Sequence, residues 1–320
     1  MEDKMKSLRL IIALIFISMI VMLCADGNNN AASYIRMGVG AKALAMGSTG
    51  VASMNNVTAA YWNPAALSRL NDFEIATMVT SNLGYDRSYN FAAIGMDMKY
   101  GYVAVSWINA SLTGLEGYDA NNNFTGEFDN SENNIALSYA LGSKRVRFGV
   151  TAKMYSSKID EDSATGYGFD AGTILEINEY MSLGLMMRDA FSEIDDDDVP
   201  YQFIIGAAAY PYHGVTLEFD FRKEEDVNDI KVGIGAEYWL TLGNDGEMGA
   251  GLGNRRQQEN TTWSDLLSKT EGGLRLGADD SNFTAGFGLR FNNFETNYAF
   301  VTAPEDFMND THRFELILRF

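Results

Sequence analysis

The chain has 320 residues and a formal net charge of −19 at pH 7, from 24 lysines and arginines against 43 aspartates and glutamates. Proteins that bind nucleic acid carry a basic surface that neutralises phosphates, so this charge argues against a nucleic-acid partner. A hydrophobic content of 46% fits a soluble protein and also a membrane barrel, whose polar inner face dilutes its apolar outer face.

The N-terminal segment is typical of an export signal. Three basic residues precede an apolar run over residues 10–23, which suits a signal-peptide core better than a membrane helix of about twenty residues; a short signal anchor is the alternative. Cleavage after Ala25 makes residues 1–25 a signal peptide and removes Cys24, the only cysteine. Leu23 disfavours lipidation of Cys24, because lipoprotein leaders usually have a small residue there. The mature chain is then expected to lack disulfides and thiolate metal sites.

Residues 26–70 are rich in glycine and alanine and precede the strand-like part of the chain. Repeated glycines and Pro64 interrupt any long helix, so we interpret this segment as a periplasmic N-terminal hatch that plugs the strand-rich region. Pro64 moves Asn63 out of the helical region, and Asn63 is expected to cap a short helix that continues to Leu70. This hatch is either a fixed plug or a gate that shifts when a ligand binds. The candidate hatch or gate residues are Gly38, Gly40, Gly47, Trp62, Asn63, Pro64 and Ala65.

From Phe73 onward the hydrophobic pattern repeats every two residues, which indicates β-strands. In residues 215–222, for example, four apolar side chains alternate with polar ones that include Glu218 and Asp220. Segments of about nine to twelve residues suit tilted strands that cross a bilayer, whereas a soluble sandwich is the alternative. Because closed bacterial barrels favour even strand numbers, residues 71–320 are predicted to form an all-β, antiparallel outer-membrane barrel of about 14 strands. The segments are 73–82, 89–99, 101–111, 133–142, 145–158, 166–178, 181–190, 201–211, 214–224, 229–240, 245–255, 272–280 with 282–292 as a hairpin, 293–302 and 312–320.

The connections between these segments alternate in length. In outer-membrane barrels short turns face the periplasm and long loops face outward. Short turns are predicted at 99–101, 142–144, 178–180 and 212–214, and long polar outer loops at 112–132, 191–200, 256–271 and 303–311.

The last strand has the pattern of a barrel-insertion signal. Apolar residues on one face alternate with Arg313, Glu315 and Arg319, and the chain ends on an aromatic residue. The predicted signal residues, which the barrel-assembly machinery would bind, are Phe314, Leu316, Leu318 and Phe320.

Motifs for catalysis and for cofactor binding are incomplete. Residues 38–43 match the loose G-x-G-x-x-A dinucleotide pattern, but no acidic residue follows before Leu70 to bind a ribose. His213 and His312, the only histidines, lack the spacing of a zinc site, and no GxSxG elbow is present. Glu218 and Asp220 are interpreted as the lining of a wet barrel. We therefore expect no catalytic residues, no cofactor and no enzymatic activity.

Two acidic segments have part of the character of a calcium site. The segment that begins at Asp119 has Phe124 and Asn130 where an EF-hand loop requires glycine and glutamate, which excludes that motif. The acidic run at 193–198 could contact cations on outer lipopolysaccharide, but a solvated loop is the favoured interpretation. No metal site is predicted.

Three stretches together resemble the PorV/PorQ family of outer-membrane proteins, which is related to FadL-type barrels. They are IRMGVGAKALAMGSTGVA with TAAYWNPAALSRL in the hatch, TAGFGLRFNNFETNYAF at 284–300, and the closing HRFELILRF. The Asn63-Pro64-Ala65 element corresponds to one in the FadL-type hatch. The resemblance implies a 14-stranded barrel with an N-terminal plug in the bacterial outer membrane.

The resemblance implies two alternative functions. PorV-type members deliver cargo of the type IX secretion system, and this chain is expected to act in protein secretion through its loops, with outer-membrane lipid, lipopolysaccharide and secretion-system proteins or cargo as partners. FadL-type members transport hydrophobic small molecules inward, which is the alternative. The long loops 112–132 and 256–271 are polar, and this favours cargo delivery over a fatty-acid channel.

Overall fold

The structure is a computed structural model that describes residues 32–81, 83–84, 86–225, 227–241, 270–279, 282–303 and 309–320. The expected signal peptide at 1–25 and the predicted strand at 245–255 lie outside these residues. Within them, no helix has the length and apolar character needed to cross a membrane.

Four short helices precede the strands in the described residues. They are η1 (Ser33–Met37), α2 (Ala41–Ala45), α3 (Ala59–Trp62) and η2 (Pro64–Arg69). The strands are β1 (Phe73–Ser81), β2 (Arg87–Met98), β3 (Gly101–Tyr118), β4 (Phe124–Gly142), β5 (Val146–Ile159), β6 (Asp162–Asn178), β7 (Met181–Ile194), β8 (Asp197–Val199), β9 (Gln202–Ala209), β10 (Val215–Glu224), β11 (Ile230–Thr241), β12 (Thr270–Asp279), β13 (Asn282–Phe291), β14 (Phe294–Val301) and β15 (Thr311–Arg319).

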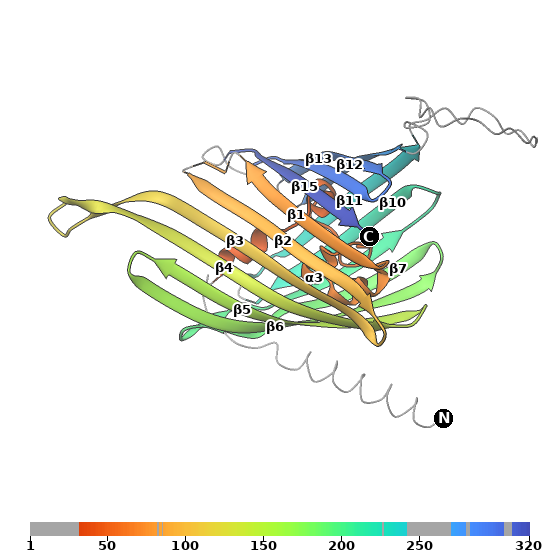
Figure 1. Ribbon diagram of the computed structural model, residues 1–320, viewed down its shortest axis with the longest axis horizontal. Coiled ribbons are helices and arrows are strands. Elements are labelled where there is room, and N and C mark those ends of the chain that lie inside the picture. The colour runs from red at the N-terminus through yellow and green to blue at the C-terminus, as the bar shows by residue number, and fades with distance from the viewer. Residues whose placement is uncertain are drawn as a thin grey trace, which may run out of the picture.

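Fourteen of these strands form one closed antiparallel barrel (Figure 1). Neighbours in sequence pair with each other, β7 pairs with both β6 and β9, and β1 pairs with β15 to close the ring. The three-residue β8 pairs only with β7 and lies outside the ring. The prediction of fourteen strands is confirmed, but the set of strands differs from the predicted set. The segment at 272–280, predicted as half of a hairpin, corresponds to the full strand β12, which pairs with β11 as well as β13.

Side chains alternate between the two faces of the barrel wall. On β10, Leu217, Phe219 and Phe221 point outward and are exposed, whereas Glu218 and Asp220 point inward and are fully buried. An apolar outer band and a polar inner face are typical of a barrel in a bilayer. The predicted alternation is therefore confirmed for this strand.

The two ends of the barrel differ in their connections. We call the end where β1 begins and β15 finishes the turn end, and the opposite end the loop end. Turns at 99–100, 143–145, 179–180 and 292–293 lie at the turn end. Strands β3 and β4 are 18 and 19 residues long, and their hairpin projects beyond the rest of the barrel at the loop end (Figure 1).

One prediction about loops is wrong. Residues 112–132 are mostly strand, because β3 and β4 remain paired as far as Tyr118 and Phe124 and only 119–123 connect them. The predicted outer loop at 256–271 lies outside the described residues except for its last two positions. The strands that flank it, β11 and β12, reach the turn end, where Thr241 pairs with Glu271.

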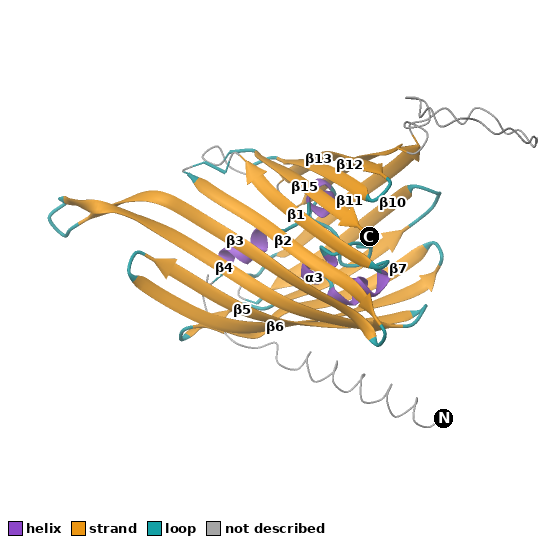
Figure 2. Ribbon diagram, in the orientation of Figure 1, coloured by secondary structure: helices purple, strands orange, loops and turns teal. Residues whose placement is uncertain are grey.

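The helices occupy the interior of the barrel (Figure 2). Residues 32–72, which we call the hatch, begin near the loop end, where Arg36 Nη2 donates to the carbonyl of Pro200 at 2.8 Å. They finish at the turn end, where the chain enters β1 at Phe73. Hatch side chains and inward side chains of the wall form a large hydrophobic core cluster, and Val51 of the hatch forms a second, smaller one with Met186 and Ile204.

Candidate functional site

The hatch packs against the wall backbone to backbone. A Cβ added at Gly277 would overlap the backbone of Met46 and Gly47, and one added at Gly149 would overlap that of Pro64 and Ala65. Only glycine permits such close approach of two main chains. We call the strand glycines at which an added Cβ would meet hatch atoms the wall glycines. They are Gly95, Gly142, Gly149, Gly172, Gly184, Gly206, Gly233, Gly235, Gly277 and Gly286.

Two carboxylates of β10 bind consecutive backbone amides of the hatch. Asp220 Oδ2 accepts hydrogen bonds from the first two N–H groups of residues 50–53, and Glu218 Oε1 accepts from the last two, at 2.9–3.3 Å. Both carboxylates are fully buried. The expectation that they line a wet barrel is therefore wrong, because the hatch replaces water as their partner.

Asn63 connects the hatch to two wall strands and also caps η2. Its Nδ2 donates to the carbonyls of Val51, Thr173 and Leu185 at 2.9, 3.2 and 3.4 Å. Its Oδ1 accepts from the N–H of Ala65 at 3.1 Å, with Pro64 at the first position of the 3₁₀ helix. The predicted cap is confirmed, and the same side chain also fastens the hatch to β6 and β7.

The remaining candidate hatch residues are Trp62 and three glycines. Trp62 is buried, and its Nε1 donates to the carbonyl of Val39 at 2.8 Å. Gly38 has φ 77, and a Cβ there would overlap the side chain of Leu44. Gly40 and Gly47 also have positive φ, which glycine adopts at low cost. These contacts hold the ring of Trp62 against the start of the hatch.

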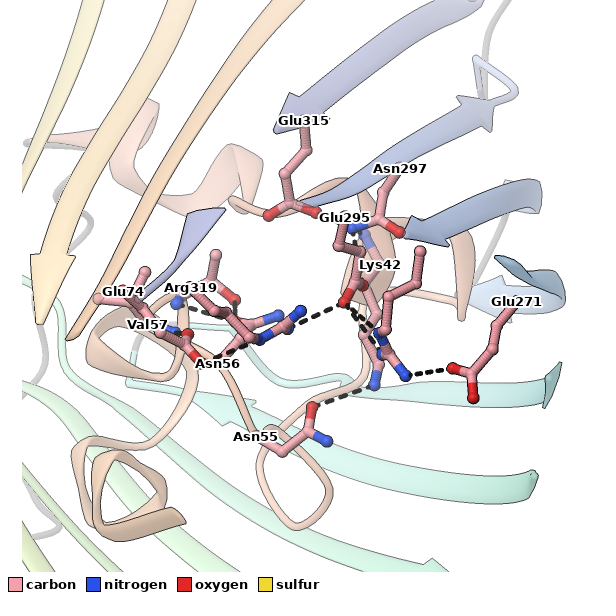
Figure 3. Close-up of polar contacts among 12 residues, drawn as sticks. Lys42, Asn55, Asn56, Val57, Glu74, Glu271, Glu295, Asn297, Glu315 and Arg319 are labelled. Carbon is pink, nitrogen blue, oxygen red and sulfur yellow. Dashed lines mark hydrogen bonds and ion pairs between the residues drawn. The ribbon is translucent and has the colours of Figure 1, made fainter. Parts of the chain in front are cut away.

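A chain of polar contacts fixes the hatch to β11, β14 and β15 (Figure 3). Lys42 Nζ lies 3.1 Å from Glu237 Oε2 and 3.3 Å from Asn55 Oδ1. The N–H of Lys42 donates to Glu315, which also accepts from Asn297 Nδ2 at 2.9 Å. Because Lys42 is buried, its ammonium group depends on these partners.

Figure 3 also shows the contacts at the turn end of the hatch. Arg319 bridges Glu74 Oε1 at 3.1 Å and Glu295 Oε2 at 2.9 Å. The other oxygen of Glu74 accepts from the N–H of Val57 at 3.0 Å. Arg319 of β15 is therefore connected to β1 and β14, and through Glu74 to the hatch.

Strand β7 contains an irregularity that turns adjacent side chains inward. Its register with β6 shifts around Arg188 to Ala190, and Asp189 has φ 57. Arg188 donates to the carbonyl of Tyr61 at 3.0 Å and stacks on the Tyr61 ring at 4.1 Å. Asp189 instead binds Lys153 at 2.6 Å on the wall. Such bulges re-aim side chains in a sheet, and this one turns Asp189 inward beside Arg188, whose own inward position continues the alternation of the strand.

A cavity of about 310 Å³ lies between the hatch and the loop end. Its floor includes Leu44, Tyr61 and Trp62 of the hatch, and Met37 lies beside them. Arg188 and Arg313 are among the wall residues that line it. A second cavity of about 530 Å³ near β2, β3 and β4 shares Met37 with the first. The arrangement can hold a small molecule above the hatch.

Other predicted residues lie elsewhere. Phe314, Leu316 and Phe320 are exposed on the outer face of β15 and its end, and Leu318 is half-buried there. Of the two histidines, His312 bonds to Tyr298 at 2.7 Å, and neither lines the first cavity. In the described residues no cluster of His, Cys, Asp or Glu is arranged to hold a metal ion. The turn that begins at Asp119 is closed by its own hydrogen bonds to Asn121 and Asn123.

Part of this arrangement is predicted by the sequence. Gly233, Gly235 and Gly286 belong to GxG pairs inside strand patterns, where small residues let a plug approach the wall closely, and the structure confirms that approach. The placement of Arg313 opposite the apolar face of the last strand is also confirmed. Sequence reasoning did not single out Arg188, although this residue continues the inward alternation of its strand.

The closed 14-strand antiparallel barrel is that of FadL-like outer-membrane barrels. The toluene transporter TbuX of Ralstonia pickettii has a similar structure, with a TM-score of 0.59 and 14% identity over 88% of this chain and 98% of TbuX. The toluene transporter TodX of P. putida gives 0.58 and 11% over 88% and 99%, and a Pseudomonas aeruginosa FadL homologue gives 0.50 and 9% over 85% and 95%. No family model and no curated protein matches the sequence.

At such low identity the likeness to these structures establishes the fold. The fold agrees with the FadL-related part of the resemblance seen in the sequence.

Proposed function

We propose that this protein is a non-enzymatic channel of the outer membrane for small molecules with a hydrophobic body. The observation that carries the proposal is the 310 Å³ cavity, whose floor presents Leu44, Tyr61 and Trp62 toward the loop end. Ligand sites are commonly concave, with apolar walls and a few polar groups. With short turns toward the periplasm, the loop end faces outward, so the cavity would receive ligand from outside.

The neighbours support this proposal through their fold. TbuX and TodX are described as toluene transporters, and a related structure, CymD, is described as a monoaromatic hydrocarbon channel. The hatch closes the lumen below the cavity, which suits a channel that admits one class of molecule and excludes solutes in general.

The test is uptake of N-phenyl-1-naphthylamine, a neutral aromatic dye, by intact cells that express the protein. We expect a faster rise in dye fluorescence than in cells without the protein. Val227→Trp, which adds a large side chain to the cavity wall, should slow that rise. Ala120→Trp, on the exposed β3–β4 turn, is the matched control and should not. Equal rates with and without the protein would refute the proposal.

Delivery of secreted cargo is a second candidate, and the projecting β3–β4 hairpin favours it. Tyr118 and Phe124 form an exposed aromatic pair at its tip, with ring centroids 5.9 Å apart. Exposed aromatic side chains are enriched where proteins bind each other. Shortening the hairpin between Leu112 and Asn130 should abolish surface display of cargo while dye uptake persists. Unchanged display in that variant would exclude this function for the hairpin.

A further inference from the structure

The cavity above the hatch is electropositive, although the chain as a whole carries a net charge of −19. Five cationic residues line it against three acidic ones. Two pairs cancel: Arg36 with Glu224 at 2.8 Å, and Arg222 with Asp279 at 2.9 Å. Lys231 and Asp229 are exposed at the rim, where solvent screens them. The charges that remain belong to Arg188 and Arg313.

These two arginines are buried without a carboxylate partner of their own. Arg188 is 3% exposed and Arg313 is 5% exposed, and within the described residues neither is in an ion pair. Lys153 binds the carboxylates of both Asp170 and Asp189, at 2.7 and 2.6 Å. One ammonium group balances only one of these two charges, so the second carboxylate offsets the charge of Arg188. The buried cation that no carboxylate offsets is therefore Arg313.

The partners of the two guanidinium groups are neutral. Arg188 bonds to Tyr61 and Gln202, and Arg313 Nη1 donates to Thr80 at 2.6 Å. Arg313 also lies over the ring of Tyr89, 5.4 Å from its centroid. The Nε atom of each arginine has no hydrogen-bond partner. A buried cation in neutral surroundings is costly, so an anion in the cavity would be stabilised there.

The rest of the cavity limits what that anion can be. Its floor carries the rings of Tyr61 and Trp62, which suit an aromatic body. A volume of about 310 Å³ is at the small end for ligand sites, which suits a compact molecule. A guanidinium fork matches the planar geometry of a carboxylate.

We infer that the preferred ligand of this cavity is a compact aromatic carboxylate, with its charged group toward Arg313 and its ring against Leu44 and Trp62. This inference rests on the proposed channel function and narrows its substrate class. It distinguishes the chain from a channel for neutral hydrocarbons, because a neutral ring brings no negative charge to offset a buried guanidinium group.

The test is calorimetric titration of the full-length protein in a non-ionic detergent with 2-naphthoate and with 2-naphthamide, its uncharged counterpart. We expect the wild type to bind naphthoate at least about tenfold more tightly than naphthamide, as one charge-assisted hydrogen bond would give. Arg313→Gln should remove most of that preference, and Arg313→Lys should retain part of it. Arg145→Gln, which changes an exposed arginine at the turn end, is the control and should bind as the wild type does.

Equal affinity of the wild type for the two compounds, or no naphthoate binding, would overturn the inference whether or not the variants fold. Persistent dye uptake together with that result would leave the channel function standing. Dye uptake by cells with the wild-type protein that is no faster than by cells without it would instead refute the channel function itself. Heat-modifiable migration on a gel shows that each variant is folded, and a folded Arg313→Gln with unchanged preference would also overturn the role of Arg313.

Discussion

The side-chain oxygen of Asn63 occupies the space in which Gly172 would carry a Cβ if it were any other residue. This contact joins the hatch to β6 at the same place where Asn63 donates to the carbonyl of Thr173. The fit therefore depends on the absence of a side chain at Gly172 and on the side-chain oxygen of Asn63.

Gly172→Ala should therefore destabilise the hatch. The added methyl overlaps Asn63 and the ring of Pro64, and overpacking of this kind costs about 1–3 kcal/mol. We expect a lower temperature for the shift in gel migration on heating. Ala171→Val adds methyl groups to the outward neighbour on the same strand and serves as the control. If both variants shift in gel migration at the same temperature as the wild type, the close fit at Gly172 does not contribute to the stability of the hatch.

Asn63→Asp tests the amide of the same side chain. The substitution keeps an oxygen that can accept a hydrogen bond from the N–H of Ala65. It places a second oxygen against the three carbonyls that accept hydrogen bonds from Nδ2 of Asn63. Because the buried acceptors lose their donor, we expect a loss of about 1–3 kcal/mol, at least as large as for Asn63→Ala. Thermal unfolding followed by circular dichroism measures both. A smaller effect for aspartate than for alanine would contradict the bonding pattern.

Glu218→Gln combined with Asp220→Asn should loosen the hatch without opening the barrel wall. The neutral amides accept more weakly from the backbone N–H groups of residues 50–53, and hydrogen bonds to charged groups contribute about 1.5–3 kcal/mol each. We expect increased protease cleavage within the hatch and increased sensitivity of cells to large antibiotics. Asp196→Asn, in the exposed β7–β8 turn, should change neither. An unaltered cleavage pattern in the double variant would show that these carboxylates do not hold the hatch.

The position of the β11–β12 connection gives a test of topology. Its flanking residues Thr241 and Thr270 lie at the turn end, so a peptide tag inserted between them should be hidden from antibody on intact cells. A tag at Asn122, in the β3–β4 turn, should be accessible. Both tags should react after the outer membrane is permeabilised. Labelling of the first tag on intact cells would reverse the orientation assigned to the barrel.

The sequence predicts the barrel more completely than it predicts the site. Alternation along 215–222 is a local property of each strand, and it survives in the structure because one face meets lipid and the other meets the hatch. The cap at Asn63 is also local, since Pro64 and Ala65 are its neighbours. Both were therefore available from short stretches of sequence.

The cavity depends on contacts between distant parts of the chain. Arg188 and Arg313 are 125 positions apart by their numbers, and they line one cavity only because the ring closes between β1 and β15. The end of the barrel at which a connection lies is also a non-local property, because a strand count carries an error at one position to every connection after it. Patterns of local period two contain no information on either point.

The wall glycines bear on the order of assembly. Because the hatch meets the wall backbone to backbone at several strands, we expect the ring to close around the hatch and not before the hatch is in place. The seam between Phe73 and Phe320 would then close last. Their backbones bond in both directions, and their rings lie 5.8 Å apart. The hatch would then be the internal support around which the barrel wall forms.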